Sequence, residues 1–476
     1  MKILFVGSEV MPFAATGGLG DVLGSLPAAL SECGGGMHVA VVMPLHKAVG
    51  SDWRDMMKIE AAFKVETGNS GEICTVNSLT RGRVRYYFIE NEKYFGRESI
   101  YGFPDDGERY AFFSAAVCEM LPKVGFIPDI LHANDWHSAL CAVYLKTIFE
   151  NKTEYEKIKC IYTIHNLEYQ GEFPPAALSG FIPSVTGGLL YNGTVNLMKA
   201  GIEYSDWVTT VSPSYAGEIQ TTLFGHGLED VLENNSHRLS GILNGIDYEY
   251  YNPETDPALA ATFSPQSLEG KYACRAAAQR EIGLMVRGDV PLLMVISRLA
   301  HHKGIDLIQE AIPRMLAKHD IQFAVLGLGE KVYEEFFFEL ERAYPGRVRA
   351  LIEYDRELAR RLYAAADIFI MPSRSEPCGL SQMIASRYGA IPVVREVGGL
   401  RDSIKNYDGK SGNGFTFAEY SARALERSIE DALALWSKRD LRLRFIRKIM
   451  ETDFSWRTSA EKYRALYRGL LEKEED

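Results

Sequence analysis

Short apolar runs recur along the whole chain, with segments of helical character between them. Examples of the runs are residues 1–6, 160–164, 291–296 and 367–371, and residues 305–317 form one of the helical segments. Nearly continuous Ile, Val and Leu strands that alternate with helices are typical of parallel sheets buried on both faces. The pattern therefore predicts an α/β fold with a Rossmann-like parallel sheet in each half.

The apolar runs end at polar or glycine-rich clusters, which are the candidate functional positions. His165 directly follows the run 160–164, Arg298 follows soon after the run 291–296, and Asp135 lies just beyond an apolar run that ends at Leu131. Ligands of parallel α/β sheets bind beyond the carboxyl ends of the strands. We therefore expect binding groups at these strand ends in both halves.

The pattern becomes irregular after residues 243–247, and a chain of 476 residues is too long for one ordinary core. We predict an N-terminal Rossmann-like domain at 1–243 and a C-terminal one at 244–455, facing each other across a cleft. The last segment, 456–476, reads as an amphipathic helix that packs back on the N-terminal domain.

Composition narrows the function classes. The formal net charge of -11 disfavours a nucleic-acid partner and an anionic membrane surface. No run reaches the ~20 apolar residues of a membrane span, and the apolar start is too short for a signal peptide. Seven cysteines without a CxxC pair fit a reduced, cytoplasmic protein.

Two loops with similar sequences each contain a Gly-Gly pair, one in each half of the chain. Thr16-Gly17-Gly18 and Val397-Gly398-Gly399 both follow an apolar run and precede a segment that can be helical. Glycines let backbone N–H groups approach a phosphate at a helix N-terminus. The simpler interpretation is that each Gly-Gly pair only forms a turn between two elements. The spacing of the first loop does not match the dinucleotide signature G-x-G-x-x-G.

Acidic and histidine clusters admit more than one interpretation. The spacing of His132, Asp135 and His137 can suit a metal, but no second cluster supplies the remaining ligands. The alternative is that Asp135 or a histidine binds polar ligand groups. Asp105-Asp106 lies among glycines and a proline, where a solvated turn is the default expectation.

Fixed cations and a carboxylate lie together in the second half. Arg298 and Lys303, at a strand end and a helix start, would neutralise a pyrophosphate leaving group, although surface solvation is the ordinary role of such side chains. Glu376 lies just before Gly379, where backbone N–H groups can point at a phosphate. A carboxylate beside a bound phosphate is repelled by it, so its presence indicates a function such as binding sugar hydroxyls.

In this order and spacing the motifs resemble bacterial glycogen synthases and plant starch synthases. The segments that carry the resemblance run almost end to end: 16–21, 132–137, 162–171, 243–247, 297–304, 373–382 and 398–400. The resemblance implies a glycosyltransferase-B fold and a retaining transfer of glucose from ADP-glucose to the non-reducing end of an α-1,4-glucan, with no metal or other cofactor. It leaves the oligomeric state open.

The resemblance also implies site residues. Those expected to act in catalysis are Glu376, Arg298, Lys303, His165 and Asp135. Those expected to bind substrate are Thr16, Gly17, Gly18, Asp21, Asn244, Tyr354, Cys378, Gly379, Leu380 and Ser381. Tyr354 would stack on the adenine.

The chain departs from the family's pattern at three positions. The family usually has Lys where this chain has Ala15, often Lys at Arg275, and Thr at Val397. Arg275 keeps the charge, and Arg275 and Lys303 could partly replace the missing cation when the cleft is closed. Two alternatives stay open: UDP-glucose as the donor, and a catalytically weak paralogue that binds glucan or nucleotide.

Overall fold

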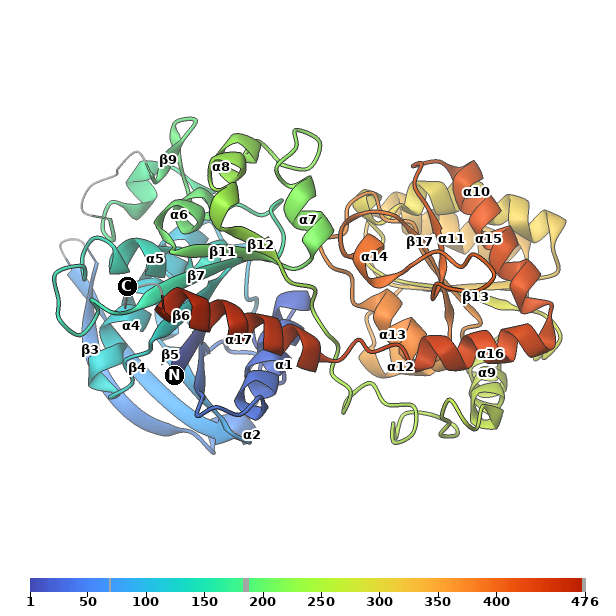
Figure 1. Cartoon of the computed structure of the whole chain (residues 1–476), viewed down its shortest axis with the longest axis horizontal. Coiled ribbons are helices and arrows are strands. Elements are labelled where there is room, and N and C mark those ends of the chain that lie inside the picture. Colours follow the sequence, from blue (N-terminus) through green and yellow to red (C-terminus); the bar gives the residue numbers. More distant parts are fainter. Residues whose placement is uncertain (68–69, 183–187, 473–476) are drawn as a thin grey trace. The chain divides into compact units, whose positions relative to one another are not determined.

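The computed structural model divides the chain into two compact units, each built around a sheet (Figure 1). It describes residues 1–67, 70–182 and 188–472. Unit 1 comprises Met1–Gly245 together with Trp456–Asp476, and unit 2 comprises Ile246–Ser455. The chain thus leaves unit 1 near residue 245 and returns to it for its last helix.

The main sheet of unit 1 is parallel over most of its width. Its strands lie in the order β12 (Leu239–Gly241), β11 (Trp207–Thr210), β7 (Lys159–Ile164), β6 (Ile130–Asn134), β1 (Lys2–Val6), β2 (His38–Pro44), β5 (Val84–Glu90), β4 (Ser70–Arg81) and β3 (Lys58–Thr67). From β12 to β5 the neighbours pair in parallel, whereas β4 and β3 pair antiparallel. A small antiparallel sheet has the order β8 (Glu172–Phe173), β10 (Thr194–Asn196) and β9 (Leu190–Tyr191).

Helices connect the strands of unit 1. They are α1 (Gly18–Glu32), α2 (Ser51–Arg54), α3 (Glu92–Phe95), α4 (Asp106–Lys123), α5 (Leu140–Leu145), α6 (Leu197–Tyr204), α7 (Pro213–Glu218), α8 (Glu229–Asn234) and, from the far end of the chain, α17 (Trp456–Glu472).

Unit 2 has a wholly parallel sheet in the described part of the chain. Its order is β15 (Val348–Leu351), β14 (Gln322–Leu326), β13 (Leu292–Ile296), β16 (Ile368–Met371), β17 (Ile391–Arg395) and β18 (Phe415–Phe417). Its helices are α9 (Glu269–Glu281), α10 (Ile305–Lys318), α11 (Lys331–Ala343), α12 (Arg356–Ala365), α13 (Ser381–Arg387), α14 (Gly398–Ser403), α15 (Ala422–Trp436) and α16 (Arg439–Met450). The predicted α/β class with parallel sheets in both halves is confirmed.

The last helix, α17, packs into the core of unit 1 beside α1 (Figure 1). Trp456, Tyr463 and Tyr467 are buried in the same apolar cluster as the side chains of β1 and α1. The Tyr467 hydroxyl hydrogen-bonds His132 Nδ1 at 2.7 Å, and Arg464 donates to the Cys33 carbonyl at the end of α1 at 2.7 Å. The first strand and helix therefore share one core with α17, which lies more than 400 residues later in the sequence.

None of the helices in the described ranges combines the length and the apolar character that crossing a bilayer requires.

Candidate functional site

In unit 1, Asp135 and His165 lie at neighbouring strand ends. Asp135 directly follows β6 and His165 directly follows β7, and these two strands pair in parallel with Asn134 opposite Thr163. The His165 backbone N–H donates to Asp135 Oδ1 at 2.8 Å, and His165 Nε2 lies 2.9 Å from Asn134 Oδ1. Parallel pairing therefore brings together two side chains that are thirty residues apart.

Burial shifts the charges of this pair toward neutrality. It raises the pKa of Asp135 to about 7, against the lowering effect of the backbone N–H groups of His165 and Asn166. It lowers the pKa of His165 to about 3, so the imidazole is neutral at physiological pH. Near neutral pH Asp135 is therefore present both as the acid and as the carboxylate, and either form can make hydrogen bonds with hydroxyl groups, as can the neutral imidazole of His165.

A carboxylate that the sequence argument did not single out organises the first glycine loop. Glu9 Oε2 accepts the Thr16 N–H at 2.6 Å and the Thr16 hydroxyl at 2.8 Å, and Glu9 Oε1 accepts the Gly20 N–H at 3.1 Å. Burial raises the pKa of Glu9, and Asp21 adds to the rise. Glu9 lies in the Gly7-Ser8-Glu9 cluster after the first apolar run, so its strand-end position was a usable signal.

This arrangement limits what the loop can offer a ligand. The N–H groups of Thr16 and Gly20 are already engaged by Glu9, while Thr16, Gly17 and Gly18 are exposed. A Cβ built on Gly18 would meet nothing within 4 Å. The exposed Gly17–Gly18 backbone at the start of α1 is the part that remains open to an anion.

The histidines on either side of Asp135 are structural. His132 is 1% exposed and is held between Tyr467 and Thr163. His137 is buried, and its ring lies within 5 Å of the rings of Trp136 and Tyr101. Among the described residues, no group of three or more His, Cys, Asp or Glu is placed to hold a metal ion.

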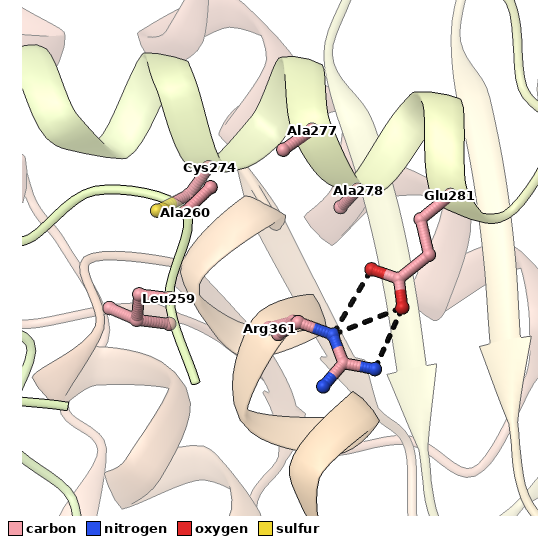
Figure 2. Close-up of a pocket in the computed structure, with 7 residues that line it drawn as sticks. All are labelled: Leu259, Ala260, Cys274, Ala277, Ala278, Glu281 and Arg361. Carbon is pink, nitrogen blue, oxygen red and sulfur yellow. Dashed lines mark hydrogen bonds and ion pairs between the residues drawn. The ribbon is translucent and has the colours of Figure 1, made fainter. Parts of the chain in front are cut away.

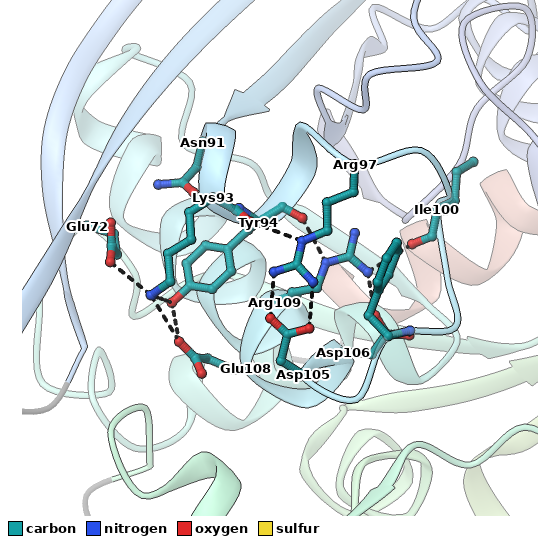
Figure 3. A network of polar contacts seen from close by, with 11 residues as sticks. Glu72, Asn91, Lys93, Tyr94, Arg97, Ile100, Asp105, Asp106, Glu108 and Arg109 are labelled. Carbon is teal, nitrogen blue, oxygen red and sulfur yellow. Dashed lines mark hydrogen bonds and ion pairs between the residues drawn. The ribbon is translucent and has the colours of Figure 1, made fainter.

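Asp105 and Asp106 form ion pairs and are not a solvated turn (Figure 3). Arg97 donates to both oxygens of Asp105 at 2.6 Å, which lowers the pKa of that carboxyl, and the fully buried Arg109 pairs with Asp106. Arg109 also donates to the Tyr94 and Ile100 carbonyls. The expectation of a solvated turn is wrong because these two arginines cross-link the loop between α3 and α4.

Asn244, three residues after β12, is 5% exposed. Its Oδ1 is buried and has no hydrogen-bond partner among the described residues. A buried acceptor of this kind is normally satisfied by a water or a ligand.

In unit 2, an ion pair stands at the carboxyl edge of the sheet. Lys303 Nζ donates to Glu376 Oε2 at 2.7 Å, and the Ser373 hydroxyl donates to the same oxygen at 3.1 Å. Glu376 is 5% exposed, and Ser373 is fully buried. Gly304 makes this approach possible, because a Cβ there would lie 2.1 Å from the Pro372 carbonyl oxygen.

Arg298 lies beside this pair in sequence, two residues after β13, and is exposed. Within the described residues its guanidinium has no hydrogen-bond or ion-pair partner. Tyr354, three residues after β15, is 72% exposed. Since β15, β13 and β16 belong to one parallel sheet, Tyr354, Arg298 and Glu376 all lie at its carboxyl edge.

The second Gly-Gly loop supports the segment after Glu376. The Gly399 N–H donates to the Glu376 carbonyl at 3.1 Å, and a Cβ on Gly399 would lie 2.1 Å from the Cys378 carbonyl oxygen. Gly399 is therefore required for close packing of two backbones, and its N–H is not available to an anion.

The next residues place backbone groups at the start of α13. Gly379 has φ +71, in the left-handed region that favours glycine, and Leu380 and Ser381 follow at the helix start. The Gln382 amide donates to the Gly379 carbonyl at 2.8 Å and to the Ser403 hydroxyl at 3.0 Å, which ties this turn to α14. Cys378 is buried at 6% exposure beneath it.

Arg275 lies at the opposite edge of the sheet, so the expectation that it could replace a missing cation is wrong. Its guanidinium pairs with Asp367 Oδ2 at 2.6 Å, and the same carboxylate accepts the Leu292 N–H at 2.9 Å. Asp367 and Leu292 are at the amino ends of β16 and β13. The strand length thus separates Arg275 from Arg298, and its role is to join α9 to the sheet.

A small pocket between α9 and α12 is not a substrate site (Figure 2). It is lined mainly by apolar side chains, and Arg361 pairs with Glu281 at its edge at 2.7 Å. Its cavity volume of about 20 Å³ would hold one water.

Comparisons with known proteins cover both units. A family model described as the starch synthase catalytic domain matches residues 2–234, and one described as glycosyl transferases group 1 matches residues 284–451. A glycogen synthase of Streptococcus gordonii is 44% identical over 99% of this chain and 100% of its own. A glycogen synthase of Bacillus subtilis is 41% identical over 100% of this chain and 99% of its own.

A solved structure is similar over the same length. The catalytic domain of starch synthase IV from Arabidopsis thaliana, bound to ADP and acarbose, superposes with a TM-score of 0.91 at 34% identity. The match covers 99% of both chains.

Proposed function

We propose that this chain, which belongs to the family of glycogen synthases and starch synthases, uses ADP-glucose to extend an α-1,4-glucan at its non-reducing end. Membership of the family makes the chain a glycosyltransferase of glycogen synthesis. The donor, the retaining course of the reaction and the roles of the individual residues are the proposal.

The observation that carries the proposal is the Lys303–Glu376 pair at the carboxyl edge of unit 2, together with Arg298, which has no side-chain partner among the described residues. Arg298 and Lys303 would bind the diphosphate, and the two cations would stabilise the charge that develops on the departing ADP. Glu376 would hold hydroxyls of the transferred glucose, fixed in place by Lys303 and Ser373.

The backbone of the same unit completes the donor site in this proposal. The N–H groups of Gly379, Leu380 and Ser381 would donate to phosphate oxygens, with Cys378 packed beneath them. The exposed ring of Tyr354 would stack on the adenine. ADP bound to the similar starch synthase IV structure supports an adenine nucleotide.

Unit 1 would act mainly on hydroxyl groups. Asp135 and His165 would bind those of glucose or of the acceptor, through the titrating carboxyl of Asp135 and the neutral imidazole of His165. Thr16, Gly17 and Gly18 would bind donor phosphates at the start of α1, with Asp21 and Asn244 as further binding residues.

The reaction itself needs no separate base. The bond from glucose C1 to the donor phosphate oxygen breaks while C1 bonds to the acceptor hydroxyl oxygen. The leaving phosphate takes the hydroxyl proton on the same face, which retains the configuration at C1. Catalysis is then chiefly positioning and charge stabilisation.

Nucleotide release tests the proposal. The chain is incubated with glycogen and either ADP-glucose or UDP-glucose, and the initial rate of nucleotide release is measured. We expect turnover with ADP-glucose and a much lower rate with UDP-glucose. A preference for UDP-glucose would identify the alternative donor. Binding without turnover would identify a catalytically weak paralogue, the alternative that the missing cation at Ala15 suggests.

Variants test the residue roles in the same assay. Arg298→Ala and Lys303→Ala should each lower kcat by roughly a hundred- to a thousand-fold, because the departing charge loses a preorganised partner. Lys331→Ala, which removes an 87% exposed lysine of α11, is the matched control and should leave kcat unchanged. Unaltered rates in both site variants would refute the diphosphate assignment.

The cellular location belongs to the proposal as well. All seven cysteines are free thiols, which supports a reducing compartment such as the cytoplasm.

A further inference from the structure

An exposed aromatic side chain stands on the loop that follows β7 in unit 1. Tyr169 lies four residues after His165 and is 49% exposed. Within the described part of the chain its hydroxyl makes no hydrogen bond and its ring contacts no other ring or cation. A single exposed tyrosine is ordinary on a protein surface. Whether Tyr169 can serve as a binding residue therefore depends on how firmly its loop is held.

That loop is fixed at both ends. Leu167 is fully buried, and its N–H donates to the Tyr215 hydroxyl at 3.2 Å. At the other end the Gly171 carbonyl accepts the Leu197 N–H at 3.1 Å, and Gly171 has φ +66. A Cβ on Gly171 would lie 2.6 Å from the Trp136 ring, so the loop is packed tightly there. The Tyr169 ring is thus presented on a preorganised backbone.

Neighbouring segments contribute more exposed apolar surface. The Gln170 side chain donates to the His226 carbonyl at 2.9 Å, and the Tyr191 hydroxyl donates to the Gly227 carbonyl. Next to these contacts in sequence are Leu190, 38% exposed, and Leu223, 73% exposed. Hydrogen bonds therefore join three segments of unit 1 that each expose an apolar side chain.

We propose that Tyr169 is a stacking platform for a glucose ring of the acceptor glucan. A pyranose ring has apolar C–H faces and a rim of hydroxyls, so a flat exposed aromatic ring next to hydrogen-bonding groups matches it. His165, at the start of the same loop, and Asp135, whose Oδ1 accepts the His165 backbone N–H at 2.8 Å, supply groups for hydroxyls. This inference rests on the proposed function, because it deepens the acceptor side of that reaction.

The test uses the full chain, with Tyr169→Ala and Tyr169→Phe as variants. The control Tyr272→Ala removes a 39% exposed tyrosine from α9 in unit 2. Retardation in native gels containing glycogen gives a dissociation constant without catalysis, and initial rates give KM for glycogen and for ADP-glucose. Tyr169→Ala should raise the glycogen Kd and KM roughly three- to ten-fold, with KM for ADP-glucose and the melting temperature unchanged. Tyr169→Phe and Tyr272→Ala should behave as the unaltered chain.

Other outcomes overturn the proposal. An unchanged glycogen Kd in Tyr169→Ala would exclude a stacking role. Equal weakening in Tyr169→Phe would assign the contact to the hydroxyl and not to the ring. A raised KM for ADP-glucose with unchanged glycogen binding would place the ring against the donor. If the unaltered chain is not retarded by glycogen, the proposed acceptor itself fails, and the gel shows this without any variant.

Discussion

At the scale of single residues, the environment of Asp135 decides its charge. Burial raises its pKa to about 7, and Glu9 adds a smaller rise, while the backbone N–H groups of His165 and Asn166 act against it. His165 itself stays neutral, since its pKa is lowered to about 3. Asp135 is therefore the group at this strand end that changes charge near neutral pH.

We expect activity to rise with pH through about 7, because the Asp135 carboxylate accepts hydrogen bonds from sugar hydroxyls more strongly than the acid does. Asp135→Asn should remove this rise and lower kcat/KM for the acceptor above pH 7 by roughly ten- to a hundred-fold. Asp52→Asn, on the exposed surface of α2, is the control. A pH–rate profile of all three proteins decides the matter, and a rise that persists in Asp135→Asn would assign it to another group.

The same shift has a consequence for stability. Between pH 4 and about 7 the unfolded chain ionises Asp135 while the folded chain keeps it protonated. The contribution of this side chain to the free energy of unfolding is therefore lost as the pH rises through that window. Asp135→Asn should flatten this part of the stability profile measured by denaturant titration.

At the scale of elements, the two Gly-Gly loops look alike in sequence but have different roles. A Cβ on Gly399 would lie 2.1 Å from a backbone oxygen of the segment that carries Glu376 and Cys378, whereas a Cβ on Gly18 meets nothing within 4 Å. The first loop is open to solvent, and the second is a packing contact between α14 and the loop after β16.

Alanine at these two glycines should separate the roles. Gly399→Ala should lower the melting temperature and kcat together, since the 376–378 segment must shift, at a cost of about 1–3 kcal/mol typical of overpacking. Gly18→Ala should keep the melting temperature and raise only KM for ADP-glucose, because its added methyl group meets the bound donor. Thermal unfolding and steady-state kinetics of both variants give the comparison. A fully active and stable Gly399→Ala would contradict the packing role.

At the scale of the whole molecule, the last helix belongs to the unit formed by the beginning of the chain. α17 buries Trp456, Tyr463 and Tyr467 in the core of unit 1. The Tyr467 hydroxyl is also the partner of His132 Nδ1 within β6. Unit 1 is therefore incomplete without the residues of α17.

Removing residues 456–476 should destabilise unit 1 and leave unit 2 largely unaffected, since Ile246–Ser455 keeps its own core. Limited proteolysis with identification of the fragments should show early cleavage in 1–245 and late cleavage in 246–455. The milder variant Tyr467→Phe should cost about 1–3 kcal/mol, because the buried His132 Nδ1 loses its hydrogen-bond partner while Nε2 keeps Thr163. Equal resistance of both units in the truncated chain would contradict this assignment.

Much of the fold was predictable because continuous apolar runs indicate buried parallel strands. The strands β3 and β4 are among those that were not predicted, because antiparallel strands with one face in solvent alternate, as in Lys64-Val65-Glu66, and do not form continuous runs. For the candidate site, spacing placed Asp135, His165, Arg298 and Glu376 at strand ends, where the structure has them. Their roles stay predictions.

The sequence by itself determined the alternation of strands and helices, the strand-end position of the polar clusters and the resemblance to the family, since all three depend only on local order along the chain. Only the tertiary structure decided which charges meet. It placed Arg275 against Asp367 at the far edge of the sheet, Lys303 against Glu376, and Glu9 beneath the first glycine loop. Such pairs depend on which strands become neighbours and which side chains lose water, and neither is encoded in the spacing of a single segment.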